Sequence, residues 1–98
     1  MATLRSTEQS MKNQVTVLFT SAGRRNQLID CFRRSASTMR LGMRVLAADM
    51  APELSSACHT ADAHFKVPRC TSSEYVPSLL DLCEREGVDL VVPTIDTE

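Results

Sequence analysis

One apolar run near the start of the chain constrains the fold more than any other feature. Val15 to Thr20, with the sequence VTVLFT, is continuous and rich in β-branched side chains. Such a run indicates a strand that is buried on both faces, as in the centre of a parallel sheet. It ends at the small residues Ser21, Ala22 and Gly23, which favour a tight turn.

After this turn the spacing of the apolar residues becomes helical, from Arg24 to about Met39. The predicted buried stripe contains Leu28, Ile29, Phe32, Ala36 and Met39. Gly42 is placed to end the helix in a left-handed conformation. A strand, a turn and a helix in this order are typical of the first unit of a parallel α/β sheet.

Further apolar segments continue the same alternation. Met43 to Ala48 predicts a second strand that ends on Asp49, and a loop with one short helical turn follows from Met50 to Asp62. Ala63 to Val67 predicts a third strand, and Val88 to Val92 predicts a fourth. We therefore expect an α/β fold, a Rossmann-like open parallel sheet with helices on both faces.

A second helix is expected between the third and fourth strands, closed by Gly87. Thr71 and Glu74 have the spacing of a capping box, which predicts its opening. Pro77 lies too deep for a regular first turn, so we expect an irregular start and regular helix from near Pro77 to Glu86. The predicted buried stripe contains Val76, Leu79, Leu80 and Cys83.

The length of 98 residues suffices for one small domain. Residues 1–13 are polar and aperiodic, so we expect a disordered leader and then a domain over residues 14–98. Glu98 comes just after a strand, where such a sheet normally continues, and we therefore expect a domain truncated at its C-terminus. The sequence contains no apolar run long enough for a bilayer and no secretory signal, so we expect a cytoplasmic protein without a membrane partner.

Charge is unevenly distributed along the chain. Residues 1–49 hold eight Lys and Arg against three Asp and Glu, whereas residues 50–98 hold three against nine. Aromatic side chains are not interleaved with the basic ones, which favours a solvated face over a nucleic-acid surface. We expect no nucleic-acid partner.

The cysteines and histidines do not form a recognisable site. Cys58, His59, His64 and Cys70 are the only group that suggests zinc, and their spacing matches no familiar ligand pattern. No Ser-His-Asp or Cys-His arrangement is discernible either. We therefore expect no metal ligands and no catalytic residues within these 98 residues.

Candidate binding residues follow the predicted strands, at the edge where open α/β sheets bind ligands. The turn from Ser21 to Arg25 opens a helix, and its backbone amides together with Arg24 and Arg25 suit a phosphate or carboxylate. The alternative is equally open: Gly23 permits a tight turn and both arginines are solvated.

Acidic residues follow two of the same strands. Asp49 is placed either to hold a ribose or to cap the turn that follows it. Asp96 and Glu98 lie two residues apart, which points both side chains to one side of an extended segment. Such a pair can bind Mg²⁺ or an ammonium group or take part in proton transfer, and the alternative is that both are solvated.

Glycine-rich phosphate-binding motifs are absent from the sequence. Gly23 is alone in its turn, so the chain has neither the Gly-x-Gly-x-x-Gly fingerprint nor a P-loop. This counts against a dinucleotide-binding function.

Taken in order, the motifs resemble the opening of ATP-grasp proteins related to the carbamoyl-phosphate synthase large subunit. They are Thr-Ser-Ala-Gly-Arg-Arg at 20–25, Ala-Asp at 61–62, Val-Pro at 67–68 and Pro-Thr-Ile-Asp-x-Glu at 93–98. The resemblance covers Val15 to Glu98 and rests on the order and spacing of these motifs rather than on any single one.

The resemblance implies a pre-ATP-grasp domain, the Rossmann-like domain that precedes the ATP-grasp module in an ATP-dependent ligase or synthase. ATP and Mg²⁺ would be bound by that module, elsewhere in the same protein, and none is expected on these residues. The enzyme would activate a carboxylate or bicarbonate as an acyl phosphate for attack by an amine or ammonia, and this domain alone would be inactive. The residues that the resemblance places on the substrate side are Ser21, Gly23, Arg24, Arg25, Asp49, Asp96 and Glu98.

Two alternatives follow from the residues themselves. One is a free-standing nucleotide- or dinucleotide-binding module that uses the turn from Ser21 to Arg25 and Asp49. The other is a non-catalytic regulatory or assembly domain whose apolar sheet edge recruits a partner.

Overall fold

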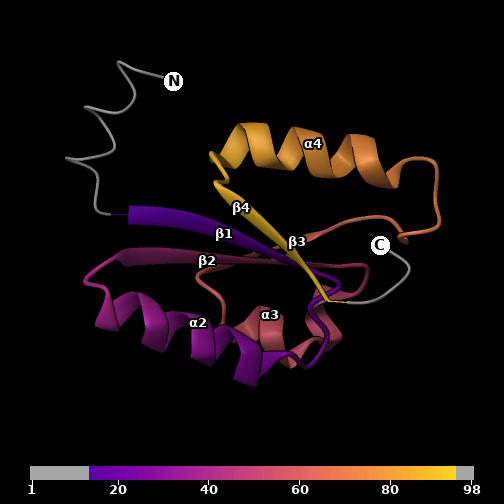
Figure 1. The fold of residues 1–98 in the computed structure, drawn as a ribbon. Coiled ribbons are helices and arrows are strands. Elements are labelled where there is room, and N and C mark those ends of the chain that lie inside the picture. The colour runs from indigo at the N-terminus through magenta and orange to yellow at the C-terminus, as the bar shows by residue number, and fades with distance from the viewer. Residues whose placement is uncertain (1–13, 95–98) are drawn as a thin grey trace, which may run out of the picture.

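A computed structural model of the chain describes residues 14–94. Within this range, four parallel strands form one sheet in the order β3-β2-β1-β4 (Figure 1). The predicted α/β class, a Rossmann-like open parallel sheet with helices on both faces, is confirmed. The elements in chain order are β1 (Gln14–Thr20), α2 (Asn26–Thr38), β2 (Gly42–Asp49), a 3₁₀ turn (Pro52–Leu54), α3 (Ser56–Thr60), β3 (Ala63–Lys66), α4 (Tyr75–Glu86) and β4 (Leu90–Pro93).

Helices α2 and α3 cover one face of the sheet, and α4 covers the other (Figure 1). Right-handed crossovers account for this arrangement, because the chain moves outward from β1 to β3 and then returns past β1 to β4. Phe19 packs on the α2 face, with its ring centroid 5.1 Å from that of Phe32. Leu18 and Leu46 are buried on the α4 face. The central strands are therefore buried on both faces, as the run of apolar residues predicts.

Helix α2 ends at a residue that the sequence analysis did not single out. Gly42 is the first residue of β2, so its predicted role as the left-handed helix terminator was wrong. Arg40 takes that conformation instead, with φ of 59°. Its amide donates to the Ser37 carbonyl at 3.0 Å, and the Leu41 amide donates to Ala36 at 2.8 Å. These two bonds are those of a Schellman motif, in which the second residue after the last helical one is left-handed.

Helix α4 begins at Tyr75, and the predicted capping box does not form. The residue before the helix is Glu74, which makes no side-chain cap; its own amide donates to the Ser72 hydroxyl at 3.1 Å. Pro77 is the third helical residue, where its missing N–H removes no intrahelical hydrogen bond. The helix therefore starts two residues earlier than expected, and it ends at Gly87 as predicted, with φ of 66°.

The buried side of α4 differs from the predicted stripe. Tyr75 and Leu82 are its buried residues, and Leu79 and Cys83 are partly buried against the same core. Val76 and Leu80 are 60% and 66% exposed, so their assignment to the core was wrong. Met39, the residue that follows α2, is likewise exposed rather than part of a buried stripe.

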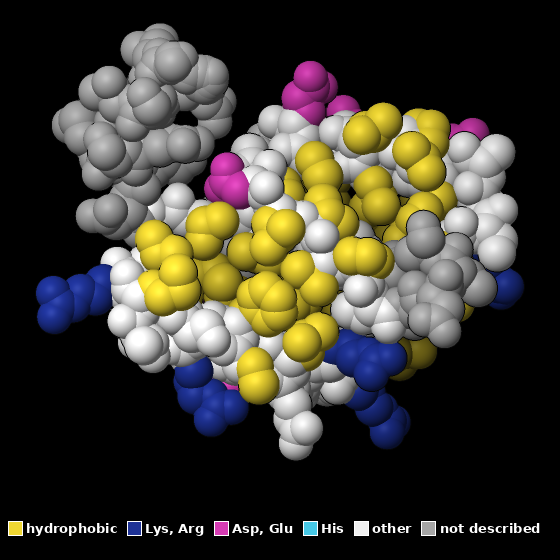
Figure 2. All heavy atoms as spheres, in the orientation of Figure 1, with side chains coloured by type: hydrophobic (Ala, Val, Ile, Leu, Met, Phe, Trp, Pro, Cys, Tyr) yellow, Lys and Arg dark blue, Asp and Glu magenta, His cyan; other side chains and the backbone are white. Residues whose placement is uncertain are grey.

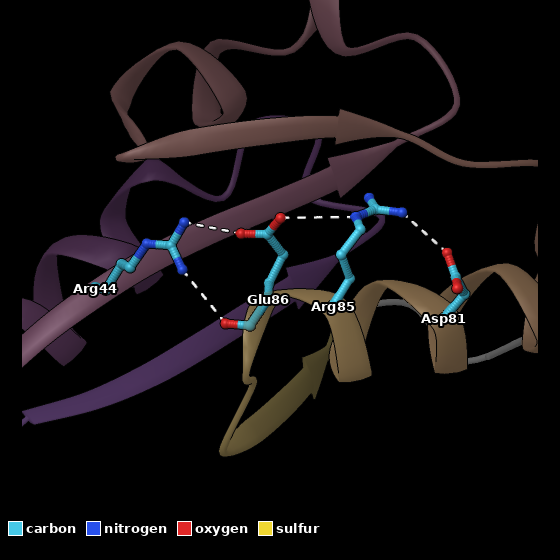
Figure 3. A network of polar contacts seen from close by, with 4 residues as sticks. All are labelled: Arg44, Asp81, Arg85 and Glu86. Carbon is cyan, nitrogen blue, oxygen red and sulfur yellow. Dashed lines mark hydrogen bonds and ion pairs between the residues drawn. The ribbon is translucent and has the colours of Figure 1, made fainter.

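The C-terminal end of α4 is tied to the sheet by an ion pair (Figure 3). The Arg44 guanidinium, on β2, donates to the Glu86 carboxylate at 2.9 Å and to the Glu86 carbonyl at 3.4 Å. Arg85 bridges Glu86 and Asp81 on the helix surface. The network links the last residues of α4 to an inner strand of the sheet.

Helix α2 has 13 residues, and a membrane span needs about 20. No helix in residues 14–94 is long and apolar enough to cross a bilayer.

Candidate functional site

The turn between β1 and α2 is tightly wound. Ser21 and Gly23 both have positive φ, 52° and 47°, and the Ala22 amide donates to the Ala48 carbonyl at 3.1 Å. The Arg25 amide donates to the Ala22 carbonyl at 2.9 Å, which closes the turn. Ala22 is fully buried, so the turn is anchored to the neighbouring strand at its centre.

Asp49 holds this turn through its carboxylate. One oxygen accepts from the Gly23 amide at 2.9 Å, and the other accepts from the Ala51 amide at 3.0 Å. The side chain therefore joins the turn after β1 to the turn after β2. Of the two roles weighed for Asp49, these contacts are those of the residue that caps a turn.

Ser55 also binds Gly23, and this contact was not predicted from the sequence. Its hydroxyl donates to the Gly23 carbonyl at 2.6 Å and accepts from the Cys58 amide at 3.1 Å. The Ala57 amide also donates to the Gly23 carbonyl, at 3.0 Å. Ser55 is 3% exposed and is the N-cap of α3. A serine before a short helical segment was the available signal, because it is a preferred N-cap residue.

These contacts limit what the turn can bind. In a dinucleotide site the backbone amides of this turn face the pyrophosphate. Here the Gly23 amide already donates to a carboxylate, which would also repel a phosphate. The geometry therefore agrees with the missing glycine fingerprint and does not favour a dinucleotide at this position.

The candidate residues are divided between two hollows on either side of the turn. Ser21 and Asp49 line a cavity of about 290 Å³ at the carboxyl ends of the strands. Its other lining residues are Met50, Val67, Pro68, Arg69, Cys70, Thr71 and Tyr75. This hollow lies between the residues that follow β2 and those that follow β3, and its walls are largely apolar.

Arg24 and Arg25 line the second hollow, on the α2 side. Its remaining residues are Asn26, Gln27, Leu28, Cys31, Ser56, Pro93 and Thr94. The Arg25 guanidinium donates to the Thr94 carbonyl at 3.1 Å, and the Thr94 hydroxyl lies 2.6 Å from the Ser21 carbonyl oxygen. This hollow therefore lies where the chain reverses direction across the sheet, at the carboxyl ends of β1 and β4. Asp96 and Glu98 follow Thr94 in the sequence and lie outside the described residues.

Burial changes the pKa of two thiols, Cys58 and Cys83. Loss of solvation raises the pKa of the Cys58 thiol above 9.0; the Ser55 hydrogen bond opposes the shift, and the nearby Asp49 charge adds to it. Burial also raises the pKa of the Cys83 thiol. Both thiols thus favour the neutral form, which is the inert state for nucleophilic or metal chemistry.

The residues that first suggested zinc do not converge. His59 and His64 lie with ring centroids 5.8 Å apart, and each ring is hydrogen-bonded to a backbone carbonyl. No group of three or more His, Cys, Asp or Glu that could hold a metal ion occurs among residues 14–94. No glycine-rich phosphate-binding loop occurs among residues 14–94 either.

Comparison with known proteins agrees with this fold. The family model described as "PylC-like, N-terminal domain" matches residues 17–98. No curated protein matches the chain significantly. The resemblance to carbamoyl-phosphate synthase in particular stays a prediction, whereas the kind of domain is established. The chain belongs to the PylC-like N-terminal domain family, a domain of the pre-ATP-grasp type.

Proposed function

We propose that this domain forms the substrate-side wall of an ATP-dependent ligase or synthase of the ATP-grasp type. Its family membership and the two hollows at the carboxyl edge of the sheet support this role. The observation that carries it is Arg24, which lies at the rim of the second hollow. Its guanidinium is exposed and has no ion pair among the described residues, so it is available to an anionic substrate.

The proposed division of labour assigns ATP and Mg²⁺ to an ATP-grasp module elsewhere in the same protein. A carboxylate oxygen of the substrate would attack the γ-phosphorus of ATP, and ADP would leave. An amine or ammonia would then attack the carbonyl carbon of the acyl phosphate, and phosphate would leave with the bonding electrons. In a carbamoyl-phosphate synthase-like version, bicarbonate is the first substrate.

In this scheme the domain binds and orients the substrate and performs no chemical step. Arg24 and Arg25 would hold a carboxylate through charge-assisted hydrogen bonds. Ser21 and the apolar cavity beside it would hold another part of the substrate. Asp49 and Ser55 would not contact the substrate. Their hydrogen bonds to Gly23 stabilise the turn that contains Ser21, Arg24 and Arg25.

The decisive experiment compares two arginines in the full-length enzyme. Arg24→Gln is expected to raise the KM for the carboxylate substrate about tenfold or more, the loss of one charge-assisted contact, and to leave the KM for ATP unchanged. Arg40→Gln is the matched control, because Arg40 is also exposed and lies at the opposite end of α2. Equal effects of the two substitutions, or a change in the KM for ATP alone, would contradict the proposal.

A second experiment separates this function from nucleotide binding by the domain itself. The 98-residue chain is titrated with ATP and Mg²⁺ and, separately, with NAD⁺, and the amides of Ser21 to Arg25 and Asp49 are followed by NMR. Neither nucleotide is expected to produce saturable shifts. Saturation by either one would mean that the domain binds nucleotide without an ATP-grasp module.

A further inference from the structure

The arginine side chains of this domain fall into two groups by their contacts. Those of the first group form an ion pair or donate to a carbonyl, and they are Arg25, Arg33, Arg34, Arg44 and Arg85. Arg24, Arg40 and Arg69 form no ion pair and no side-chain hydrogen bond among residues 14–94. Arg40 follows α2, whereas Arg24 and Arg69 line the two hollows at the carboxyl ends of the strands. Figure 2 shows Lys and Arg side chains at the right of the view, where Figure 1 draws these strand ends.

The loop after β3 positions Arg69 at this edge of the sheet. The Val67 amide donates to the Asp49 carbonyl at 3.1 Å, so the chain is still attached to the end of β2 when it leaves β3. The Ser72 amide then donates to the Arg69 carbonyl at 2.9 Å. The backbone on both sides of Arg69 is therefore hydrogen-bonded, while its side chain is exposed. This side chain lines the cavity that also contains Ser21 and Asp49, which we call the Ser21 cavity.

The Ser21 cavity suits a small ligand with an apolar part. Its volume of about 290 Å³ is near the lower end of the range for ligand pockets, which is about 300 to 1,000 Å³. Val67 and Tyr75 form buried parts of its lining, and Met50 and Pro68 add further apolar surface. Apolar walls beside an unpaired guanidinium favour a ligand that joins an apolar group to an anion.

Asp49 is the other charged residue of the lining, and it does not neutralise Arg69. No ion pair joins these two side chains among the described contacts. Both Asp49 oxygens accept from backbone amides instead, those of Gly23 and Ala51. An anion in the cavity is therefore expected beside Arg69 and away from Asp49, because like charges repel.

We propose that the Ser21 cavity binds an apolar group that ends in an anion, either a carboxylate or a phosphate, and that Arg69 binds this anion. A guanidinium can form two parallel hydrogen bonds with either of these groups. That the ligand is part of the enzyme's substrate rests on the proposed function, in which Arg24 and Arg25 hold another carboxylate. The substrate would then carry two anionic groups, one on each side of the turn from Ser21 to Arg25.

Three probes of equal chain length test the cavity without an ATP-grasp module. The 98-residue chain is titrated with hexanoate, hexyl phosphate and hexanamide, and its amides are followed by NMR. At least one of the two anions is expected to shift the amides of Arg69, Cys70 and Thr71 saturably, and the tighter of the two identifies the anionic group. Hexanamide carries no charge, so its Kd should be about fivefold or more above that of the tighter anion.

Arg69→Gln removes the proposed contact at an exposed position, so the substitution leaves the core intact. This variant is expected to bind the tighter anion no better than it binds hexanamide. Arg40→Gln is the matched control, because Arg40 is also exposed and unpaired among the described residues but does not line the cavity. It should keep the wild-type preference for the anion. A wild type that binds neither anion, or that binds hexanamide as tightly, overturns the proposal, and so does a preference that Arg69→Gln keeps.

Failure of this inference can be distinguished from failure of the proposed function. If Arg24→Gln raises the KM for the carboxylate substrate but the cavity shows no preference for an anion, the proposed function stands and this inference is wrong. If the cavity prefers an anion and Arg24→Gln leaves that KM unchanged, the anion site stands and its assignment to the substrate is wrong.

Discussion

Asp49 illustrates how much of this site depends on a single side chain. Its two oxygens accept from the amides of Gly23 and Ala51, which belong to turns after two different strands. Each amide would otherwise be a partly buried donor without a partner. A carboxylate at the end of a second strand is a familiar ribose ligand, and here its acceptor positions are directed to the protein's own backbone instead.

Replacing Asp49 should therefore destabilise the fold more than replacing a solvated acid. Asp49→Ala is expected to lower the free energy of unfolding by about 2 kcal/mol, since two backbone donors lose their acceptor. Asp30→Ala, which removes one partner of an exposed i, i+4 ion pair with Arg34, should cost less than about 1 kcal/mol. Urea unfolding of both variants measures the difference, and equal losses would mean that the Asp49 contacts are not stabilising.

Cys58 gives a dependence of stability on pH. Burial holds its pKa above 9.0 in the folded state, so the folded chain disfavours the thiolate relative to the unfolded chain. The associated stability is complete below pH 9 and is lost as the pH rises toward the folded-state pKa. The free energy of unfolding should thus fall more between pH 8 and pH 10 in the wild type than in Cys58→Ala. Cys31→Ala, which replaces an exposed thiol, controls for the loss of a cysteine as such. A fall as steep in Cys58→Ala as in the wild type would contradict this prediction.

The positions of these residues follow from the sequence more readily than their hydrogen-bond partners do. Asp49 and the turn from Ser21 to Arg25 follow from strand ends, which an apolar run marks clearly. The bond between Ser55 and the Gly23 carbonyl joins residues 32 positions apart, and no local pattern specifies such a contact. The same limit explains why Ser21 and Arg24 could not be assigned to different hollows before the turn was seen in three dimensions.

At the scale of elements, each of the two long helices is followed by a residue in the left-handed conformation, and the two residues differ. Arg40 adopts φ of 59° after α2, and Gly87 adopts φ of 66° after α4. A side chain in this region costs about 1 kcal/mol, which glycine avoids. No atom outside the neighbouring residues lies within 4 Å of a Cβ added at Gly87, so only the backbone conformation would resist one.

Opposite substitutions at these two positions should have opposite effects. Arg40→Gly is expected to raise the free energy of unfolding by about 0.5–1 kcal/mol, and Gly87→Ala to lower it by about 1 kcal/mol. Thermal or urea unfolding of the two variants provides the measurement. Destabilisation by Arg40→Gly would indicate that the Arg40 side chain contributes more than its backbone strain costs.

The order of the strands and helices follows from sequence more securely than the orientation of α4 does. Apolar residues occur on more than one side of this helix, since Tyr75, Val76, Leu79, Leu80 and Leu82 are all available for burial. A periodic pattern alone therefore cannot choose the buried side. The structure buries Tyr75 and Leu82 and leaves Val76 and Leu80 exposed, which is why the predicted stripe was rotated about the helix axis.

At the scale of the whole molecule, stability is distributed unevenly across the sheet. Strands β1 and β2 have neighbours on both sides and contain the most deeply buried side chains, among them Val17, Leu18 and Leu46. Strand β4 has one neighbour and partly exposed side chains on each face. Local opening should therefore begin at β4 while the two central strands stay paired.

Amide hydrogen exchange should reveal this gradient. Amides of Phe19 and Leu46 are expected to exchange only through global unfolding, and the amides of β4 to exchange faster by an order of magnitude or more. Equal protection of the β4 and β1 amides would show instead that the edge strand opens only with the whole sheet.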